Sequence, residues 1–343
     1  MDVAPLPNPS PPGGGAQNLR LQTTVVVAEG SEPLKIAAEV FVPAELAQPP
    51  LALICLPGGG MSRRYYDLQA ADGDESFSFA RQMAKRGYLV VTLDHAGIGD
   101  SDRPADSYAL TPERVMQANA EATAQLLARL RDGSLLPALG PLPTLRSIGI
   151  GHSMGAMFTI LQQAAQAQHA AIAVLGFSTR GLPEYVSPRV KELAAQSVEA
   201  VRAELVESAR KMFGGAHYPE IKPNPQASRI FEGAQADPRG VEAIKAARAP
   251  LLPVPAFFSM IPGNVAPEAA RISVPVFLGL GERDMVGDPQ RVPAAFSASP
   301  AVELYLQPGA GHSHFLFDSR FELYDRLAGW MVSALAHLDE GRA

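Results

Sequence analysis

The sequence predicts an α/β protein with a mostly parallel central sheet that helices flank on both faces. Two observations lead to this fold class. Short runs dense in Val, Ile and Leu alternate along the chain with longer amphipathic segments. Most of the short runs are almost continuously apolar, as strands are when a parallel sheet buries them on both faces. With 343 residues, of which 47% are hydrophobic, the chain is long enough for one large core with an insertion.

Eight runs are predicted as strands. Residues 23–30 and 35–43 come first and are expected to form a hairpin. The other six runs are residues 51–59, 88–97, 146–153, 171–178, 274–284 and 302–312. Helices are expected between the strands and after the last one, chiefly at residues 76–87, 111–133 and 321–338.

The chain divides into a tail, a core and an insertion. Residues 1–21 are rich in Pro and Gly without an apolar period, so we expect a mobile tail outside the fold. The core should comprise residues 22–179 and 270–343. Residues 180–269 contain helical pattern but no convincing strand, and we expect them to form a helical lid inserted after the sixth strand. The lid should lie over the carboxyl ends of the strands, where open α/β sheets bind ligands.

Two features of the expected lid bear on a binding site. Residues 190–213 place apolar side chains on one face of what we expect to be a first long helix. Farther along, Phe257 and Phe258 either line a substrate pocket or pack the lid onto the core.

Charge and composition limit the partners. The chain has 35 Asp and Glu residues against 29 Lys and Arg residues and no basic cluster beyond isolated pairs, so neither nucleic acid nor membrane is an expected partner. No apolar run approaches a membrane span and the N-terminus lacks a secretory signal, so we expect a cytoplasmic protein acting on a small molecule. The single cysteine, Cys55, excludes an internal disulfide and a cysteine metal cluster.

The stretch IGIGHSMGAMF, residues 148–158, has two incompatible interpretations. As a dinucleotide-binding turn it fails in detail, because the third glycine position falls on Met154 and no acidic residue ends the following strand. As G-x-S-x-G it places Ser153 between a strand and a helix. That sharp turn exposes the serine oxygen, and glycines on both sides prevent clashes. The sequence therefore favours Ser153 as a nucleophile over a helix-capping serine.

A nucleophilic serine needs a base and a group that orients the base. The strand run 274–284 ends at Asp284 and the run 302–312 ends at His312, on the same edge of a parallel sheet as Ser153. Glu282 is an alternative to Asp284, and His314 is an alternative to His312. A metal site made from His312, His314, His95 and Asp284 is a weaker alternative because no other ligand spacing supports it.

These motifs together resemble the α/β-hydrolase superfamily of serine esterases and lipases, from about residue 22 to 337. GHSMG at residues 151–155 is similar to its nucleophile elbow, GERD at 281–284 to its acid loop, and PGAGH at 308–312 to its histidine loop. DHAGIGDSDRP at 94–104 resembles the loop after its fourth strand. The resemblance implies a catalytic triad of Ser153, Asp284 and His312.

The resemblance also implies an oxyanion hole made of two backbone N–H groups. Carried over, these belong to Gly59 and Met154, with Gly60 as a near alternative. Pro57 stands where many members have histidine, which affects the shape of the loop rather than the chemistry.

The function implied is hydrolysis of a carboxylic ester or lactone of a small, mainly apolar substrate through an acyl-enzyme, with no cofactor and no metal. Carbon–carbon bond hydrolysis and thioester hydrolysis use the same triad and stay open. A receptor that retains a hydrolase pocket is the non-enzymatic alternative. Asp94 and His95 are expected to hold their loop, and Arg63, Arg64, Tyr65 and Tyr66 to lie on a surface helix. His152 is a candidate for the pocket.

Overall fold

The computed structural model describes residues 19–27, 33–221 and 235–340. Its centre is one eight-stranded sheet in the order β1-β2-β4-β3-β5-β6-β7-β8. The predicted fold class is confirmed: β3 to β8 are parallel to their neighbours, and β1 and β2 add an antiparallel edge. The strands are β1 (Leu19–Val27), β2 (Leu34–Val42), β3 (Leu51–Leu56), β4 (Leu89–Leu93), β5 (Arg146–His152), β6 (Ala171–Leu175), β7 (Val276–Gly281) and β8 (Val302–Gln307).

The first strand begins earlier than the sequence suggested. β1 pairs with β2 in a continuous antiparallel register from Leu19↔Val42 to Val27↔Leu34, so residues 19–21 belong to the sheet and not to a tail. The side chain of Arg20 pairs with Glu39 on β2, which accounts for a charged residue at the start of an apolar strand. The rest of the expected tail lies outside the described residues.

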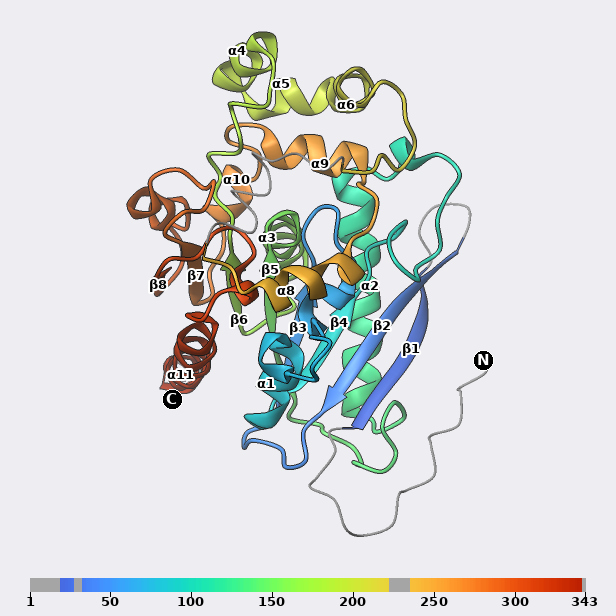
Figure 1. Cartoon of the computed structure of the whole chain (residues 1–343), viewed down its shortest axis with the longest axis vertical. Helices are drawn as coiled ribbons and strands as arrows, with labels where there is room; N and C mark the ends of the chain where they lie inside the picture. The colour runs from blue at the N-terminus through green and yellow to red at the C-terminus, as the bar shows by residue number, and fades with distance from the viewer. Residues whose placement is uncertain (1–18, 28–32, 222–234, 341–343) are drawn as a thin grey trace.

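Helices cover both faces of the sheet (Figure 1). On one face lie α2 (Pro112–Arg131) and α3 (Met154–Gln166), and on the other lie α1 (Phe79–Lys85) and α11 (Arg320–Glu340). Each face has its own buried apolar cluster, because alternate side chains of the central strands point to opposite faces. The two-faced burial explains why these strands are almost continuously apolar in the sequence.

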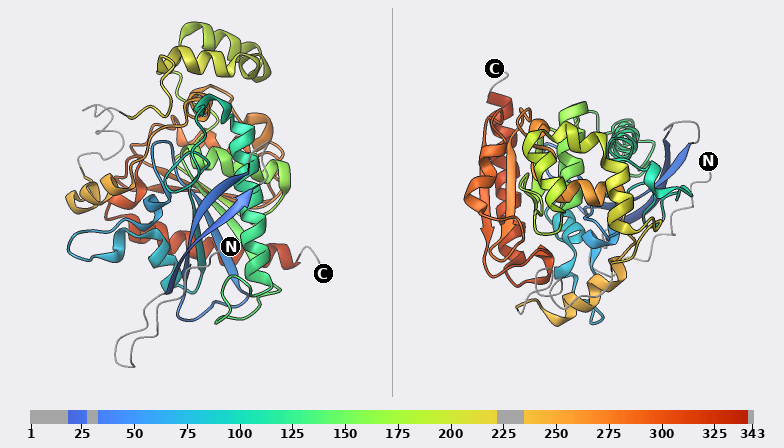
Figure 2. Two further views of the ribbon diagram at one scale, coloured as in Figure 1. Left: turned by 90° about the vertical axis from the view of Figure 1, so that its right-hand side faces the viewer. Right: turned by 90° about the horizontal axis from the view of Figure 1, so that it is seen from above.

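The segment between β6 and β7 is helical in its described part. It contains α4 (Pro188–Gln196), α5 (Val198–Ala203), α6 (Leu205–Phe213), α8 (Pro238–Ile244), η4 (Lys245–Ala247), α9 (Pro253–Met260) and α10 (Ala266–Ala269). Helices α4, α5 and α6 lie farthest from the sheet, above α9 (Figures 1 and 2). That the segment acts as a lid stays a prediction.

The single long helix expected over residues 190–213 is wrong. Ser197 is extended, with φ −162° and ψ 150°, and its hydroxyl accepts a hydrogen bond from Ala200 N to begin α5. A second break falls at Glu204. The apolar spacing is continuous through both breaks, but serine at a helix N-cap competes with helix continuation, and the spacing alone does not reveal this.

The junction of β5 with α3 leaves no room for a side chain at Gly155. A Cβ atom there would lie 2.0 Å from Leu56 O and 2.5 Å from Pro57 O, both at the end of β3. Backbone atoms cannot move aside as a flexible side chain can. Only glycine at position 155 therefore allows the first turn of α3 to pack this closely against the end of β3.

No helix among residues 19–27, 33–221 and 235–340 is long and apolar enough to cross a membrane.

We predict that Gly155→Ala destabilises the protein by about 3 kcal/mol or more, the upper end of the range for overpacking, because the methyl group meets backbone oxygens. The matched control is Gly329→Ala in α11, where a Cβ has no neighbour within 4 Å among the described residues. That change should raise stability by up to about 1 kcal/mol through helix propensity. Denaturant unfolding of both variants is the measurement. Equal stabilities for the two would contradict the packing argument.

Candidate active site

Ser153 sits in a strained backbone turn between β5 and α3. Its φ of 52° and ψ of −121° are rare for a residue with a side chain. Ser153 N donates to Leu175 O at 2.8 Å, which ties the turn to β6. At Gly151 a Cβ would lie 2.4 Å from the Cα of Ala156, so the strand and helix come too close for any other residue there. This is the strand–turn–helix context that the sequence interpretation required.

Asp284 and His312 lie together beyond the ends of β7 and β8. His312 Nδ1 is 2.8 Å from Asp284 Oδ1, and both side chains are almost fully buried. Burial by itself would raise the pKa of Asp284, but the positive charge and hydrogen bond of His312 outweigh it and lower the pKa to about 2. Asp284 is therefore a carboxylate at neutral pH and fixes the Nδ1–H tautomer of His312.

The two alternatives to this pair have other partners. Glu282 is exposed and accepts a hydrogen bond from Gly309 N at 2.7 Å. His314 is buried, with Nδ1 2.7 Å from Gln307 Oε1 and Nε2 3.7 Å from Asp284 Oδ2. Burial lowers the pKa of His314 to about 4, so this ring is neutral at pH 7. The geometry brings Asp284 and His312 together as the orienter and the base.

One cavity joins the nucleophile to the base. It has a volume of about 30 Å³ and is lined by Ser153, Met154, Gly176, Phe177, Ser178, Gly181, Leu182, Ser259, Met285, Val286 and His312.

Gly176, which follows β6, belongs to this site although the sequence interpretation did not single it out. With φ +61°, its Cα faces the triad, and a Cβ would lie 3.1 Å from His314 Nε2 and 3.2 Å from both Asp284 Oδ2 and His312 Nδ1. The signal in the sequence was a glycine at the end of a buried strand, which this chain repeats elsewhere.

The loop after β3 carries the expected oxyanion donors. A Cβ on Gly59 would lie 3.6 Å from Met154 Sδ and 3.8 Å from Met154 Cβ, so Gly59 faces the first residue of α3. Gly60, with φ +74°, faces Ile221 instead, and its carbonyl accepts a hydrogen bond from Ala249 N. Met154 is the first residue of α3, so its backbone N–H has no acceptor within the helix. Of the two glycines, Gly59 is the one beside Met154.

Buried polar groups anchor this loop. His95 Nε2 is 2.9 Å from Pro57 O, and burial lowers the pKa of His95, so a neutral ring donates to the carbonyl. Asp94 is fully buried, accepts from Arg63 N at 2.6 Å and forms an ion pair with the Arg63 guanidinium. Asp94 and His95 thus hold the loops as expected.

The expected surface position of residues 63–66 is wrong for Arg63, Tyr65 and Tyr66, whereas Arg64 is exposed as expected. Tyr65 and Tyr66 have no exposed area, and Arg63 is 4% exposed. They form the 3₁₀ helix η1 (Arg63–Asp67) underneath the site, where the Tyr66 hydroxyl donates to Leu56 O at 2.9 Å. Arg63 is buried in an ion pair with Asp94, and Tyr65 and Tyr66 pack against each other. These three side chains therefore do not form the polar helix face that the sequence suggested.

The candidates for the pocket do not line this cavity. Phe257 and Phe258 are 2% and 1% exposed, pack within α9 and are not among the residues that line the cavity. The Arg202 guanidinium lies 5.0 Å from the Phe258 ring centre. His152 is also buried and lies behind His312, with ring centres 4.7 Å apart.

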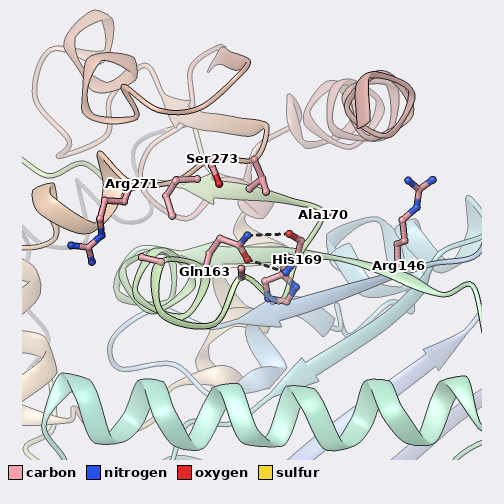
Figure 3. Close-up of a pocket in the computed structure, with 10 residues that line it drawn as sticks. Arg146, Gln163, His169, Ala170, Arg271 and Ser273 are labelled. Atoms are coloured by element: carbon pink, nitrogen blue, oxygen red, sulfur yellow. Dashed lines mark hydrogen bonds between the residues drawn. The ribbon is translucent and has the colours of Figure 1, made fainter. Parts of the chain in front are cut away.

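A second cavity lies at the amino ends of β5, β6 and β7 (Figure 3). It has a volume of about 320 Å³. On its floor the Gln163 amide exchanges hydrogen bonds with the backbone of His169, and His169 Nδ1 is 3.0 Å from Ser147 Oγ. The side chains of Arg146 and Arg271 point away from each other (Figure 3). Since these buried polar groups hydrogen-bond to one another, we do not propose a catalytic or binding site in this cavity.

The side chains of the alternative metal site are not arranged as metal ligands. His95 bonds to Pro57 O and contacts Asn119, away from Asp284. Among the residues that the structure describes, no three His, Cys, Asp or Glu side chains are grouped as metal ligands.

The sequence matches a model of a known protein family over most of its length. The sequence model described as "Alpha/beta hydrolase family" matches residues 53–326. The chain belongs to the α/β-hydrolase family. That range of the α/β-hydrolase chain includes the β5–α3 turn, the insertion after β6 and the loops of Asp284 and His312. No curated protein sequence matches the chain at a significant level.

Solved structures share the fold of this α/β-hydrolase at low sequence identity. A thermostable carboxyl esterase from Bacillus coagulans is 17% identical, with a TM-score of 0.62 over 92% of this chain and 98% of its own. A thermophilic esterase from Thermogutta terrifontis is 16% identical, with a TM-score of 0.56 over 91% and 98%. Proline iminopeptidase of Mycobacterium smegmatis is 19% identical, with a TM-score of 0.54 over 92% and 100%. At these identities the similarity establishes the fold alone.

We predict that Asp284→Asn lowers kcat for the hydrolysed substrate by about 10³- to 10⁴-fold, because the amide stabilises the wrong tautomer of His312. Glu282→Gln, two residues away, should stay within about twofold of the parent. Steady-state kinetics on both variants test this assignment. A larger loss in Glu282→Gln than in Asp284→Asn would reverse it.

Proposed function

We propose that the protein is a serine hydrolase that cleaves a carboxylic ester or lactone through an acyl-enzyme. The observation that carries this proposal is the position of Ser153 on a strained turn, in the same cavity as a histidine that is bonded to a buried carboxylate. The two esterases of the same fold are consistent with it. A cytoplasmic location stays a prediction of the sequence.

In the proposed reaction, His312 takes the proton of Ser153 as the serine oxygen attacks the carbonyl carbon of the ester. Asp284 keeps Nδ1 of His312 protonated and offsets the charge of the imidazolium that forms. The backbone N–H groups of Gly59 and Met154 stabilise the negative charge on the carbonyl oxygen. His312 then gives its proton to the leaving alcohol.

The second half of the reaction repeats these roles with water. His312 removes a proton from a water molecule, which attacks the acyl-enzyme. As the tetrahedral intermediate collapses to the free acid, the bond to Ser153 breaks and His312 returns the proton to the serine oxygen. These steps use the groups of the protein and water. Carbon–carbon bond and thioester hydrolysis would use the same groups, so a substrate panel and not the geometry separates them from ester hydrolysis.

The size of the cavity limits the range of substrates that we propose. A volume of about 30 Å³ holds two or three water-sized groups. The apolar side chains around it are Phe177, Leu182, Met285 and Val286, while the hydroxyls of Ser178 and Ser259 donate to backbone carbonyls. We therefore propose that the ester places a short, apolar group of one or two carbons between Ser153 and Met285.

We predict that Ser153→Ala lowers ester hydrolysis by about 10⁴-fold or more, as expected when a nucleophile is removed. The assay is release of nitrophenol from a panel of esters with acyl chains from acetyl to decanoyl, together with aryl lactones. A variant that stays within tenfold of the parent would exclude the proposed mechanism. If neither protein turns over any substrate, the proposal gives way to a carbon–carbon bond hydrolase or a receptor, and a dienone substrate and ligand binding are measured next.

We predict that Met285→Ala extends the range of esters accepted. Two series are compared, one that lengthens the acyl group and one that lengthens the alcohol. In one of them kcat/KM of the parent should fall steeply beyond about two carbons, and Met285→Ala should move the fall to longer chains because it enlarges the cavity. Since only the backbone of Met285 bonds to Asp284, the triad should keep its geometry.

The control for this change is Val332→Ala on the exposed surface of α11, which should leave both series unchanged. Rates that stay flat to about six carbons in both series of the parent would contradict the proposed size limit.

A further inference from the structure

His152, the residue before the nucleophile, lies at the meeting point of three loops. Its Nε2 is 2.8 Å from the backbone carbonyl oxygen of His312. Its ring stacks on Tyr65 of η1 with centres 4.5 Å apart and planes 24° apart. On another side, a Cβ added to Gly58 of the oxyanion loop would lie 2.9 Å from its Nδ1. The side chain is 3% exposed, so packing as well as bonding fixes its position.

The hydrogen bond to His312 determines the tautomer of His152. A carbonyl oxygen only accepts, so Nε2 must carry the proton. Burial lowers the pKa of His152 well below its ordinary value, so the ring is neutral and Nδ1 is a bare lone pair. Nδ1 has no hydrogen-bond partner among the described residues. The one polar contact of this ring is therefore the bond it donates to His312.

We infer that His152 is a positioning residue, which holds the main chain of His312 at a fixed distance from Ser153 through the bond from Nε2 to the His312 carbonyl. The inference rests on the proposed function. Because His152 and Ser153 are adjacent in the chain, the bond connects the nucleophile and the base through one side chain and one peptide unit. His152 is not among the residues that line the cavity, so we expect it to affect the chemical step.

Other contacts of the histidine loop leave this task to His152. Arg283 N donates to Ala310 O at 2.9 Å, which holds the loop two residues before His312. The bond between His312 Nδ1 and Asp284 holds one end of the imidazole ring. The bond at the carbonyl of His312 restrains the backbone from which the ring projects. A displacement of about 1 Å at a reacting group costs on the order of 10²-fold in rate, which sets the scale of the effect.

Three substitutions separate the N–H donor from the ring. His152→Phe keeps an aromatic ring against Tyr65 and removes the donor. His152→Gln places an amide N–H at about the reach of Nε2, whereas His152→Asn holds the same amide too short to reach the carbonyl. We expect kcat to fall about 10- to 100-fold in the Phe and Asn variants, with KM within about threefold of the parent, and to recover to within about fivefold in the Gln variant.

The readouts are steady-state ester hydrolysis, the melting temperature of each variant and the rate of reaction with a fluorophosphonate. In that reaction a bond forms from Ser153 Oγ to phosphorus, fluoride leaves, and His312 takes the serine proton. Phosphonylation does not depend on which ester is the substrate, so it tests the positioning role separately from the proposed function. We expect its rate to follow the same order among the variants. His169→Gln, which changes a buried histidine at the amino ends of the strands, should leave kcat within twofold.

Several outcomes would overturn the inference. One is a kcat in the Phe variant within threefold of the parent. Another is a loss in the Gln variant as large as in the Asn variant, which would assign the effect to ring stacking. A rise in KM without a fall in kcat would make His152 a substrate contact. If the Phe variant does not fold, the comparison of Gln with Asn still decides. A parent that phosphonylates but hydrolyses no ester would contradict the proposed function alone.

Discussion

One backbone constraint underlies the active edge of this protein: the left-handed conformation of Ser153 between β5 and α3. It turns the chain so sharply that the strand and the helix touch, which is why Gly151 and Gly155 have no room for a Cβ. The same turn places Ser153 and Met154, the first residue of α3, on the lining of the cavity. Close packing of β5 and β3 against α3 therefore maintains the strain at the nucleophile.

Burial keeps two of the three histidines around Asp284 neutral. Burial lowers the pKa values of His152 and His314, so neither competes with His312 for the carboxylate of Asp284. The pKa of Asp284 in the folded protein, about 2, lies below its ordinary 3.8. This carboxylate therefore contributes stability above about pH 4, and the contribution is lost as the pH falls through 2. The proposed catalysis and the folding stability thus depend on the same hydrogen-bonded pair, His312 and Asp284.

Some elements of the structure could be predicted from the sequence and others could not, for physical reasons that differ between elements. All eight strands were predictable, since a parallel sheet buried on both faces demands apolar runs, and the sites at their ends follow from the shared polarity of the strands. The insertion was less predictable: its first three helices, α4 to α6, share one continuous apolar spacing in the sequence, and a capping serine at residue 197 separates the first two. Arg63, Tyr65 and Tyr66 were misplaced on the surface because the buried partner of the arginine, Asp94, lies 31 residues away in sequence. Gly176 went unnoticed because its role appears only when three distant loops meet.

The central claim is that Ser153 carries the acyl group during turnover. The most direct measurement is rapid acid quenching of the enzyme as it hydrolyses nitrophenyl acetate, followed by mass spectrometry of its peptides. We expect an acetyl group on Ser153 that appears before the steady state and disappears once substrate is exhausted. Turnover with an unmodified Ser153, or with the acetyl group on another residue, would contradict it.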